Sequence, residues 1–176
     1  ICAGYKQESI KEWFNDYFIN HSDVTFDFTK NGEMQIHNNM SDPWIVTVVD
    51  TGLNTMTGGR IKRVKKYINN EQFMLTYGDG VSNININELI KYHNEHQKKL
   101  TLTAVKTGQR FGVLDINKDN NVTSFREKSD SDGSRINAGF MVCQPEVIDY
   151  IDGDETIFER KPLEKLASEN EISAYK

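Results

Sequence analysis

Apolar and polar residues alternate along the first third of the chain with two different periods. Residues 9–18 carry apolar side chains at helical spacing, which is typical of an amphipathic helix. Residues 24–28 and 34–37 alternate at strand spacing on either side of the Asn31-Gly32 pair. Because Asn-Gly suits the backbone of a tight turn, this segment predicts a β-hairpin.

Strand-like and helix-like segments alternate through the middle of the chain. Apolar runs rich in β-branched residues predict strands at residues 44–49, 73–77 and 100–105. Residues 60–67 and 86–99 show helical spacing. Strands that follow one another through helices imply parallel neighbours in an α/β sheet.

The pattern changes in the second half of the chain. Short apolar runs at residues 111–116, 122–125 and 136–143 are separated by polar turns, which predicts an antiparallel meander. Short helices and a last strand at residues 171–175 follow. We therefore expect an α/β fold with a Rossmann-like, doubly wound mixed sheet and a small antiparallel β insertion, forming a single domain over residues 1–176.

Composition and charge exclude several classes of partner. Hydrophobic residues make up 37% and charged residues 27% of the 176 residues, as in ordinary globular proteins. The formal net charge of −5 argues against a nucleic-acid-coating surface, and no apolar run is long enough to cross a membrane.

Cys2 and Cys143 lie in apolar runs without a CxxC motif, so we expect buried free thiols in a cytoplasmic protein. The four histidines, including His93 and His96, lie in surface-like contexts.

Both ends of the sequence look interrupted. Ile1 to Ala3 read as the end of a buried strand, with no preceding polar arm, and the last predicted strand also stops abruptly. We expect the sequence to be a fragment or ordered core, with a fold incomplete at both ends.

One acid stands between two glycines directly after a predicted buried strand. Asp79, between Gly78 and Gly80, follows the strand at 73–77. Ligands of open α/β sheets gather at the carboxyl ends of the strands, and Mg²⁺ accepts one or two carboxylates together with substrate phosphates. An aspartate that hydrogen-bonds its own turn would give the same pattern. Local chemistry leaves a metal ligand and a turn residue as open alternatives.

The segment Thr57 to Arg60 places two glycines before a predicted helix. Free backbone N–H groups at a helix start bind anions, and the fork-shaped guanidinium of Arg60 suits a phosphate. A loop with an exposed arginine is the alternative interpretation.

Two later motifs suit a sugar phosphate. Glu127 can accept hydrogen bonds from sugar hydroxyls and Lys128 can neutralise a phosphate, although a solvated charge pair explains them equally well. Asn137 precedes Ala138 and Gly139, where an amide beside small residues could contact a sugar. A bulge at the start of a strand is the alternative.

In this order the motifs resemble the sugar-phosphate nucleotidyltransferase family, and within it the cytidylyl branch. The segments that carry the resemblance are DPWIVTVVDTG, MTGGRIKRV, LTYGDGV, RFGVLDI, FREK and INAGFMV. The resemblance implies a nucleotidyltransferase fold and a Mg²⁺-dependent reaction, in which CTP and α-D-glucose 1-phosphate give CDP-glucose and pyrophosphate. Such in-line transfer needs positioning and charge neutralisation rather than a covalent nucleophile.

The resemblance also implies roles for individual residues. Asp79 matches the family's catalytic, Mg²⁺-binding aspartate. Contacts to the nucleotide are implied for Thr55, Gly59, Arg60 and Gly78. Contacts to the sugar phosphate are implied for Gly112, Glu127, Lys128, Asn137 and Gly139. The resemblance further implies a role in precursor synthesis for O-antigens and other surface polysaccharides.

Some family features are changed or absent. Ser129 replaces a proline after Lys128, and Ala138 stands where glycine is usual. The family's glycine-rich loop and its second Mg²⁺-binding aspartate have no counterpart in these 176 residues, so we expect this chain alone to be inactive. A relative with another sugar or nucleotide, and a degenerate domain that only binds nucleotide-sugar, remain alternatives. We also expect a homo-oligomer, with the hairpin as a candidate assembly arm.

Overall fold

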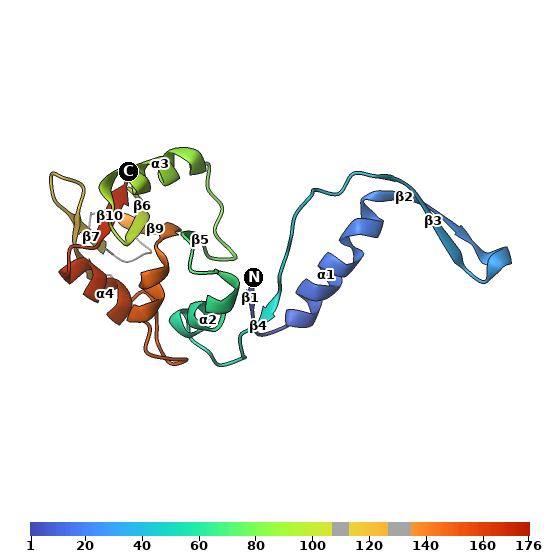
Figure 1. Ribbon diagram of the computed structural model, residues 1–176, viewed down its shortest axis with the longest axis horizontal. Helices are drawn as coiled ribbons and strands as arrows, with labels where there is room; N and C mark the ends of the chain where they lie inside the picture. Colours follow the sequence, from blue (N-terminus) through green and yellow to red (C-terminus); the bar gives the residue numbers. More distant parts are fainter. Residues whose placement is uncertain (107–112, 127–134) are drawn as a thin grey trace. The chain divides into compact units, whose positions relative to one another are not determined.

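The computed structural model describes residues 1–106, 113–126 and 135–176. The described chain forms two compact units, Ile1–Asn54 and Thr55–Lys176 (Figure 1). Each unit has its own secondary structure. The single domain over residues 1–176 that we expect from the sequence stays a prediction. None of the helices in the described part of the chain is long and apolar enough to cross a membrane.

The first unit contains a short parallel strand pair, one long helix and a hairpin. Its elements are β1 (Cys2–Ala3), α1 (Gln7–Asn20), β2 (Ser22–Asp27), η1 (Phe28–Lys30), β3 (Glu33–Asn39) and β4 (Val49–Asp50). The predicted helix and hairpin are both confirmed, and β2 pairs antiparallel with β3. Asn31 and Gly32 have φ angles of 58° and 81°, the left-handed backbone that makes this residue pair a turn signal.

The strand predicted at residues 44–49 is largely absent. Only Val49 and Asp50 form a strand, and residues 41–48 have no regular secondary structure. Among the described residues, only Val49 and Asp50 of this segment have strand partners, Cys2 and Ala3 of β1, and a segment without a paired neighbour forms no ladder. Cys2 on β1 is exposed, so the prediction that both thiols are buried is wrong for Cys2 and confirmed for Cys143.

The second unit contains a mixed sheet with helices around it. Its elements are α2 (Thr57–Arg63), η2 (Lys65–Tyr67), β5 (Phe73–Leu75), α3 (Ile86–His96), β6 (Leu100–Val105), β7 (Val113–Ile116), β8 (Val122–Arg126), β9 (Ile136–Cys143), η3 (Pro145–Tyr150), α4 (Lys161–Ser168) and β10 (Ile172–Tyr175). The strands follow the order β10-β6-β9-β7-β8, and β5 also pairs with β9. Because β10 and β6 are parallel whereas β9 is antiparallel to its neighbours, the predicted mixed sheet is confirmed.

Strand β9 determines where the candidate site lies. Its residues 141–143 pair with β5 on one side and with β6 on the other, antiparallel in both cases. Strands β5 and β6 therefore run in the same direction, although they are not neighbours. Their carboxyl ends lie at the edge where β9 begins, which brings residues 77–80 to the same edge as residues 136–139.

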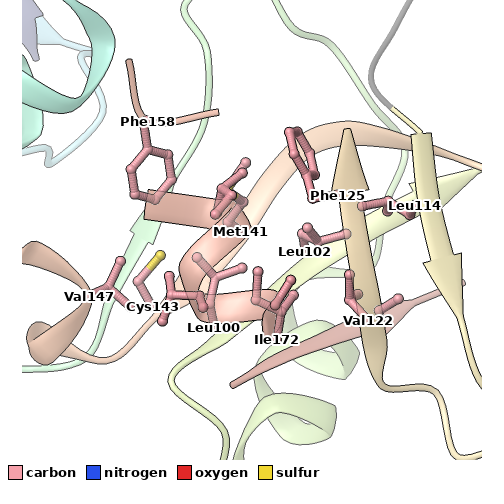
Figure 2. Close-up of a cluster of buried hydrophobic side chains, with 14 of the residues drawn as sticks. Leu100, Leu102, Leu114, Val122, Phe125, Met141, Cys143, Val147, Phe158 and Ile172 are labelled. Atoms are coloured by element: carbon pink, nitrogen blue, oxygen red, sulfur yellow. The ribbon is translucent and has the colours of Figure 1, made fainter. Parts of the chain in front are cut away.

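Alternate residues of β6 face two different layers. Leu100 and Leu102 lie in the hydrophobic core (Figure 2). The same core contains Leu163 and Leu166 of α4. Between them, Thr101 forms a hydrogen bond to His93 of α3. Because strand side chains alternate between the faces of a sheet, α4 and α3 cover opposite faces of β6. Full burial of each leucine contributes about 1.5–3 kcal/mol, so this core holds the sheet and α4 together.

His93 is fully buried rather than on the surface as the sequence suggested. Its Nδ1 lies 2.8 Å from Thr101 Oγ1, and its Nε2 lies 2.9 Å from Nε2 of the Gln144 side chain. His96 Nε2 lies 2.7 Å from the same threonine oxygen. Burial is possible because both ring nitrogens of His93 have hydrogen-bond partners.

Candidate functional site

The acid of the YGDG segment lies in a turn directly after β5. Gly78 and Asp79 form the turn, and the Gly80 N–H donates to the Tyr77 carbonyl oxygen at 3.3 Å. Asp79 is exposed. Within residues 1–106, 113–126 and 135–176, its carboxylate forms no hydrogen bond or ion pair. The interpretation as an aspartate that hydrogen-bonds its own turn is therefore wrong, and the carboxylate is available to a ligand.

The two glycines beside Asp79 are not required by the fold. Neither Gly78 nor Gly80 has a positive φ. A Cβ on Gly78 would meet nothing within 4 Å, and one on Gly80 would make only ordinary contacts, the shortest at 3.6 Å. Because the two glycines have no side chains, the backbone around Asp79 is open, and a ligand can approach it closely.

The glycines of the TGGR segment serve packing instead. The N–H groups of Gly58 and Gly59 both donate to the Thr156 carbonyl oxygen, at 2.9 and 3.3 Å. A Cβ on Gly58 would lie 2.7 Å from that oxygen, and one on Gly59 would lie 2.6 Å from Asp154 Cα. The expectation that free amides here bind an anion is therefore wrong, because the segment at 154–156 already occupies them.

The other predicted nucleotide contacts lie around the start of α2. Thr55 is buried, with 8% of its surface exposed, and its Cγ2 would lie 2.7 Å from a Cβ on Gly59. Arg60 is half-buried on α2. Nucleotide contacts by these residues stay predictions.

Glu159 connects the TGGR and YGDG segments, and sequence reasoning missed it. Its Oε1 accepts a hydrogen bond from Tyr77 Oη at 2.5 Å, and its Oε2 accepts one from Thr57 Oγ1 at 2.6 Å. Thr57 Oγ1 in turn accepts from the Phe158 N–H at 2.9 Å. No local pattern signals this role, because Glu159 is 82 residues from Tyr77 and 102 residues from Thr57 along the chain.

The INAGF segment forms the bulge that was the alternative interpretation. Pairing between β6 and β9 shifts register between Leu102 and Ala104, opposite residues 137–141. Asn137 Oδ1 accepts a hydrogen bond from the Gly139 N–H at 2.9 Å, and Gly139 has a φ of 83°. A Cβ on Gly139 would lie 2.5 Å from Cδ2 of Tyr77. The bulge thus packs against the residue that begins the YGDG turn.

The structure therefore brings several predicted residues to one edge of the second unit. Tyr77 contacts the Gly139 bulge and, through Glu159, the first residue of α2, while Asp79 follows Tyr77 by two positions. The predicted sugar-phosphate contacts Gly112, Glu127 and Lys128, together with Ser129, lie outside the described residues.

The fit of a divalent metal rests on Asp79. In the described part of the chain there is no group of three or more histidine, cysteine, aspartate or glutamate side chains that could hold a metal ion. One free carboxylate is nevertheless the donor that a hard cation accepts when substrate phosphates supply further oxygens. Asp79 therefore fits such a metal as a single protein ligand among the described residues.

Comparisons with known proteins identify the same family as the sequence motifs. The family model for nucleotidyl transferases matches residues 24–171. Glucose-1-phosphate cytidylyltransferase of Salmonella typhimurium is 49% identical over 176 residues, which cover 99% of this chain and 68% of that protein. The probable glucose-1-phosphate cytidylyltransferase of Bacillus subtilis is 42% identical, and the match covers 100% of this chain and 68% of that protein.

Solved structures show the same fold. The crystal structure of HddC from Yersinia pseudotuberculosis in complex with GMP-PN has a TM-score of 0.68 and 23% identity, with 99% of this chain and 67% of that chain covered. The chain thus spans about two thirds of the length of its relatives, whose family generally uses a divalent metal. The resemblance inferred from the sequence motifs is confirmed: the chain belongs to the nucleotidyl transferases and, among them, to the glucose-1-phosphate cytidylyltransferase family.

Proposed function

We propose that this chain forms part of an enzyme that transfers a cytidylyl group from CTP to α-D-glucose 1-phosphate, giving CDP-glucose and pyrophosphate. The observation that carries the proposal is the carboxylate of Asp79, which is exposed at the carboxyl edge of the sheet beside open backbone and has no bonding partner among the described residues. The names of the relatives at 49% and 42% identity supply the substrates.

In the proposed reaction, an oxygen of the sugar phosphate attacks the α-phosphorus of CTP. The bond from that phosphorus to the β-phosphate oxygen breaks, and pyrophosphate leaves. Asp79 would hold Mg²⁺, which when bound offsets negative charge on the phosphates. The protein's remaining task is to orient the two substrates in line.

Other residues of the site contribute binding in this proposal. Arg60 neutralises a phosphate of the nucleotide with its guanidinium. Nucleotide contacts by Thr55, Gly59 and Gly78 are part of the proposal on the sequence resemblance alone. Asn137 and Gly139 form the edge of the sugar-phosphate subsite. Its other members in the proposal are Gly112, Glu127 and Lys128, whose support is the sequence resemblance alone.

The proposed function is tested by product formation. The purified full-length gene product is incubated with Mg²⁺, glucose 1-phosphate and each nucleoside triphosphate in turn, and pyrophosphate and nucleotide-sugar are quantified. CDP-glucose as the main product supports the proposal. A different nucleotide-sugar would show that the specificity has changed, and binding of CTP without pyrophosphate release would show a binding-only protein; either result contradicts the proposal.

We also propose that the protein self-associates and works in the cytoplasm. Support for self-association comes from apolar side chains of the first unit that are exposed in the monomer, including Trp13 on α1 at 54% and Phe26 on β2 at 51%. Light scattering coupled to size-exclusion chromatography tests this. A monomer at micromolar concentration would contradict it.

A further inference from the structure

We propose that Glu159 is a positioning residue that fixes the YGDG turn to the start of α2. The inference rests on the proposed function, because it concerns how Asp79 on that turn is presented to the metal and the nucleotide. It assigns no contact between Glu159 and a substrate.

Both oxygens of the Glu159 carboxylate are engaged by hydroxyl groups. Tyr77 Oη donates to Oε1 at 2.5 Å and Thr57 Oγ1 donates to Oε2 at 2.6 Å. A carboxylate that accepts two hydroxyl donors forms charge-assisted hydrogen bonds, which are shorter and stronger than bonds between neutral groups. The side chain of Glu159 thus joins two segments that are not adjacent in the sequence.

The two joined segments are those that carry the proposed site. Asp79 lies two residues after Tyr77, and Arg60 lies three residues after Thr57. The Tyr77 ring is also fixed at its other side, because it lies so close to Gly139 that a Cβ there would be 2.5 Å from the ring. With the ring held by the bulge and the hydroxyl held by Glu159, Tyr77 sets where the turn leaves β5.

The fold of this region has support that does not depend on the Glu159 carboxylate. The neighbouring Phe158 side chain belongs to the hydrophobic core and is only 1% exposed (Figure 2). The Phe158 N–H also bonds directly to Thr57 Oγ1. We therefore expect loss of the carboxylate to loosen the turn rather than to unfold the unit.

The test compares Glu159→Gln and Tyr77→Phe with a matched control, Tyr92→Phe. The control also removes a hydrogen-bonded tyrosine hydroxyl from the second unit. Tyr92 Oη lies 2.9 Å from Ser173 Oγ and makes no contact with Glu159 in the hydrogen bond that it loses. Hydrogen exchange of the peptide covering residues 76–81 reports on the turn without any activity. We expect this peptide to exchange about threefold to tenfold faster in both test variants, and at the wild-type rate in the control.

Activity of the full-length gene product gives a second readout. We expect Glu159→Gln and Tyr77→Phe each to raise the Mg²⁺ concentration for half-maximal activity about threefold to tenfold. The double variant should show little more than the larger single effect, because both changes break the same connection. Tyr92→Phe should leave the Mg²⁺ dependence unchanged.

The outcomes separate this inference from the proposed function. Wild-type protein that makes no CDP-glucose would contradict the proposed function, while the exchange rates would still decide whether Glu159 fixes the turn. Unchanged exchange at residues 76–81 in both test variants would overturn the inference. So would an unchanged Mg²⁺ dependence accompanied only by a lower urea midpoint, because that pattern indicates a purely structural role.

Discussion

The burial of His93 makes the stability of the second unit depend on pH in a defined direction. Burial in the space between α3 and the sheet, together with a smaller charge repulsion from the nearby His96, lowers the pKa of His93 from 6.5 to about 4. The pKa of His96 is also lowered, mainly by its own partial burial. The folded protein therefore disfavours the protonated form of both rings.

The size of the effect follows from the two pKa values of His93. Because the folded-state pKa is the lower one, the unfolded chain binds the proton first as the pH falls. The contribution to stability is fully present above the unfolded value of 6.5 and is lost progressively down to about pH 4. Between pH 8 and pH 5 the protein should lose about 2 kcal/mol of unfolding free energy through His93. His96 adds a loss of the same sign.

Urea unfolding followed by far-UV circular dichroism at pH 8, 7, 6 and 5 measures this directly. The variant His93→Gln removes the titrating group and should show a flatter dependence on pH, even if it is less stable at pH 8. His37→Gln is the matched control, because His37 lies exposed on the hairpin and bonds Thr25. Equal slopes for His93→Gln, His37→Gln and wild type between pH 8 and 5 would refute the reasoning.

Three further changes have defined outcomes. Gly139→Ala should lower the unfolding free energy by about 1–3 kcal/mol, because its Cβ would meet the Tyr77 ring at a positive φ; an unchanged thermal midpoint would contradict this. Asn85→Ala should cost about 1 kcal/mol, because its side chain caps α3 by accepting from the Glu88 N–H at 3.2 Å; steady-state kinetics should not change. Arg60→Ala should raise the KM for CTP more than the KM for glucose 1-phosphate, and the reverse order would refute its proposed place at the nucleotide.

Local signals in the sequence predicted local structure well. The Asn31-Gly32 pair located the hairpin because a left-handed backbone at both residues is a property of the turn itself. The alternation of strands and helices correctly indicated an α/β fold, but the parallel neighbours it implied are wrong for β5 and β6, because antiparallel β9 lies between them. The strand predicted at residues 44–49 was overestimated, because within the described chain only Val49 and Asp50 pair with another strand.

Non-local contacts explain what the sequence could not reveal. Two glycines before a helix suggest free amides, but the carbonyl oxygen of Thr156, far along the chain, already accepts both. His93 shares the helical period of Leu89 and Ile90, but the distant Gln144 side chain, which pairs with its second ring nitrogen, cannot be read from that spacing. For Asp79, the sequence left two interpretations open, and the structure removed the one in which the carboxylate bonds its own turn.

The central claim is that Asp79 supplies a carboxylate to the metal that assists cytidylyl transfer. Turnover of the full-length gene product is measured with CTP, glucose 1-phosphate and Mg²⁺ as the only divalent metal, for wild type and Asp79→Asn. The account predicts a loss of at least about 100-fold in turnover. The urea midpoint should not change, because Asp79 is exposed and its carboxylate has no bonding partner among the described residues. Near wild-type turnover by Asp79→Asn would contradict the account.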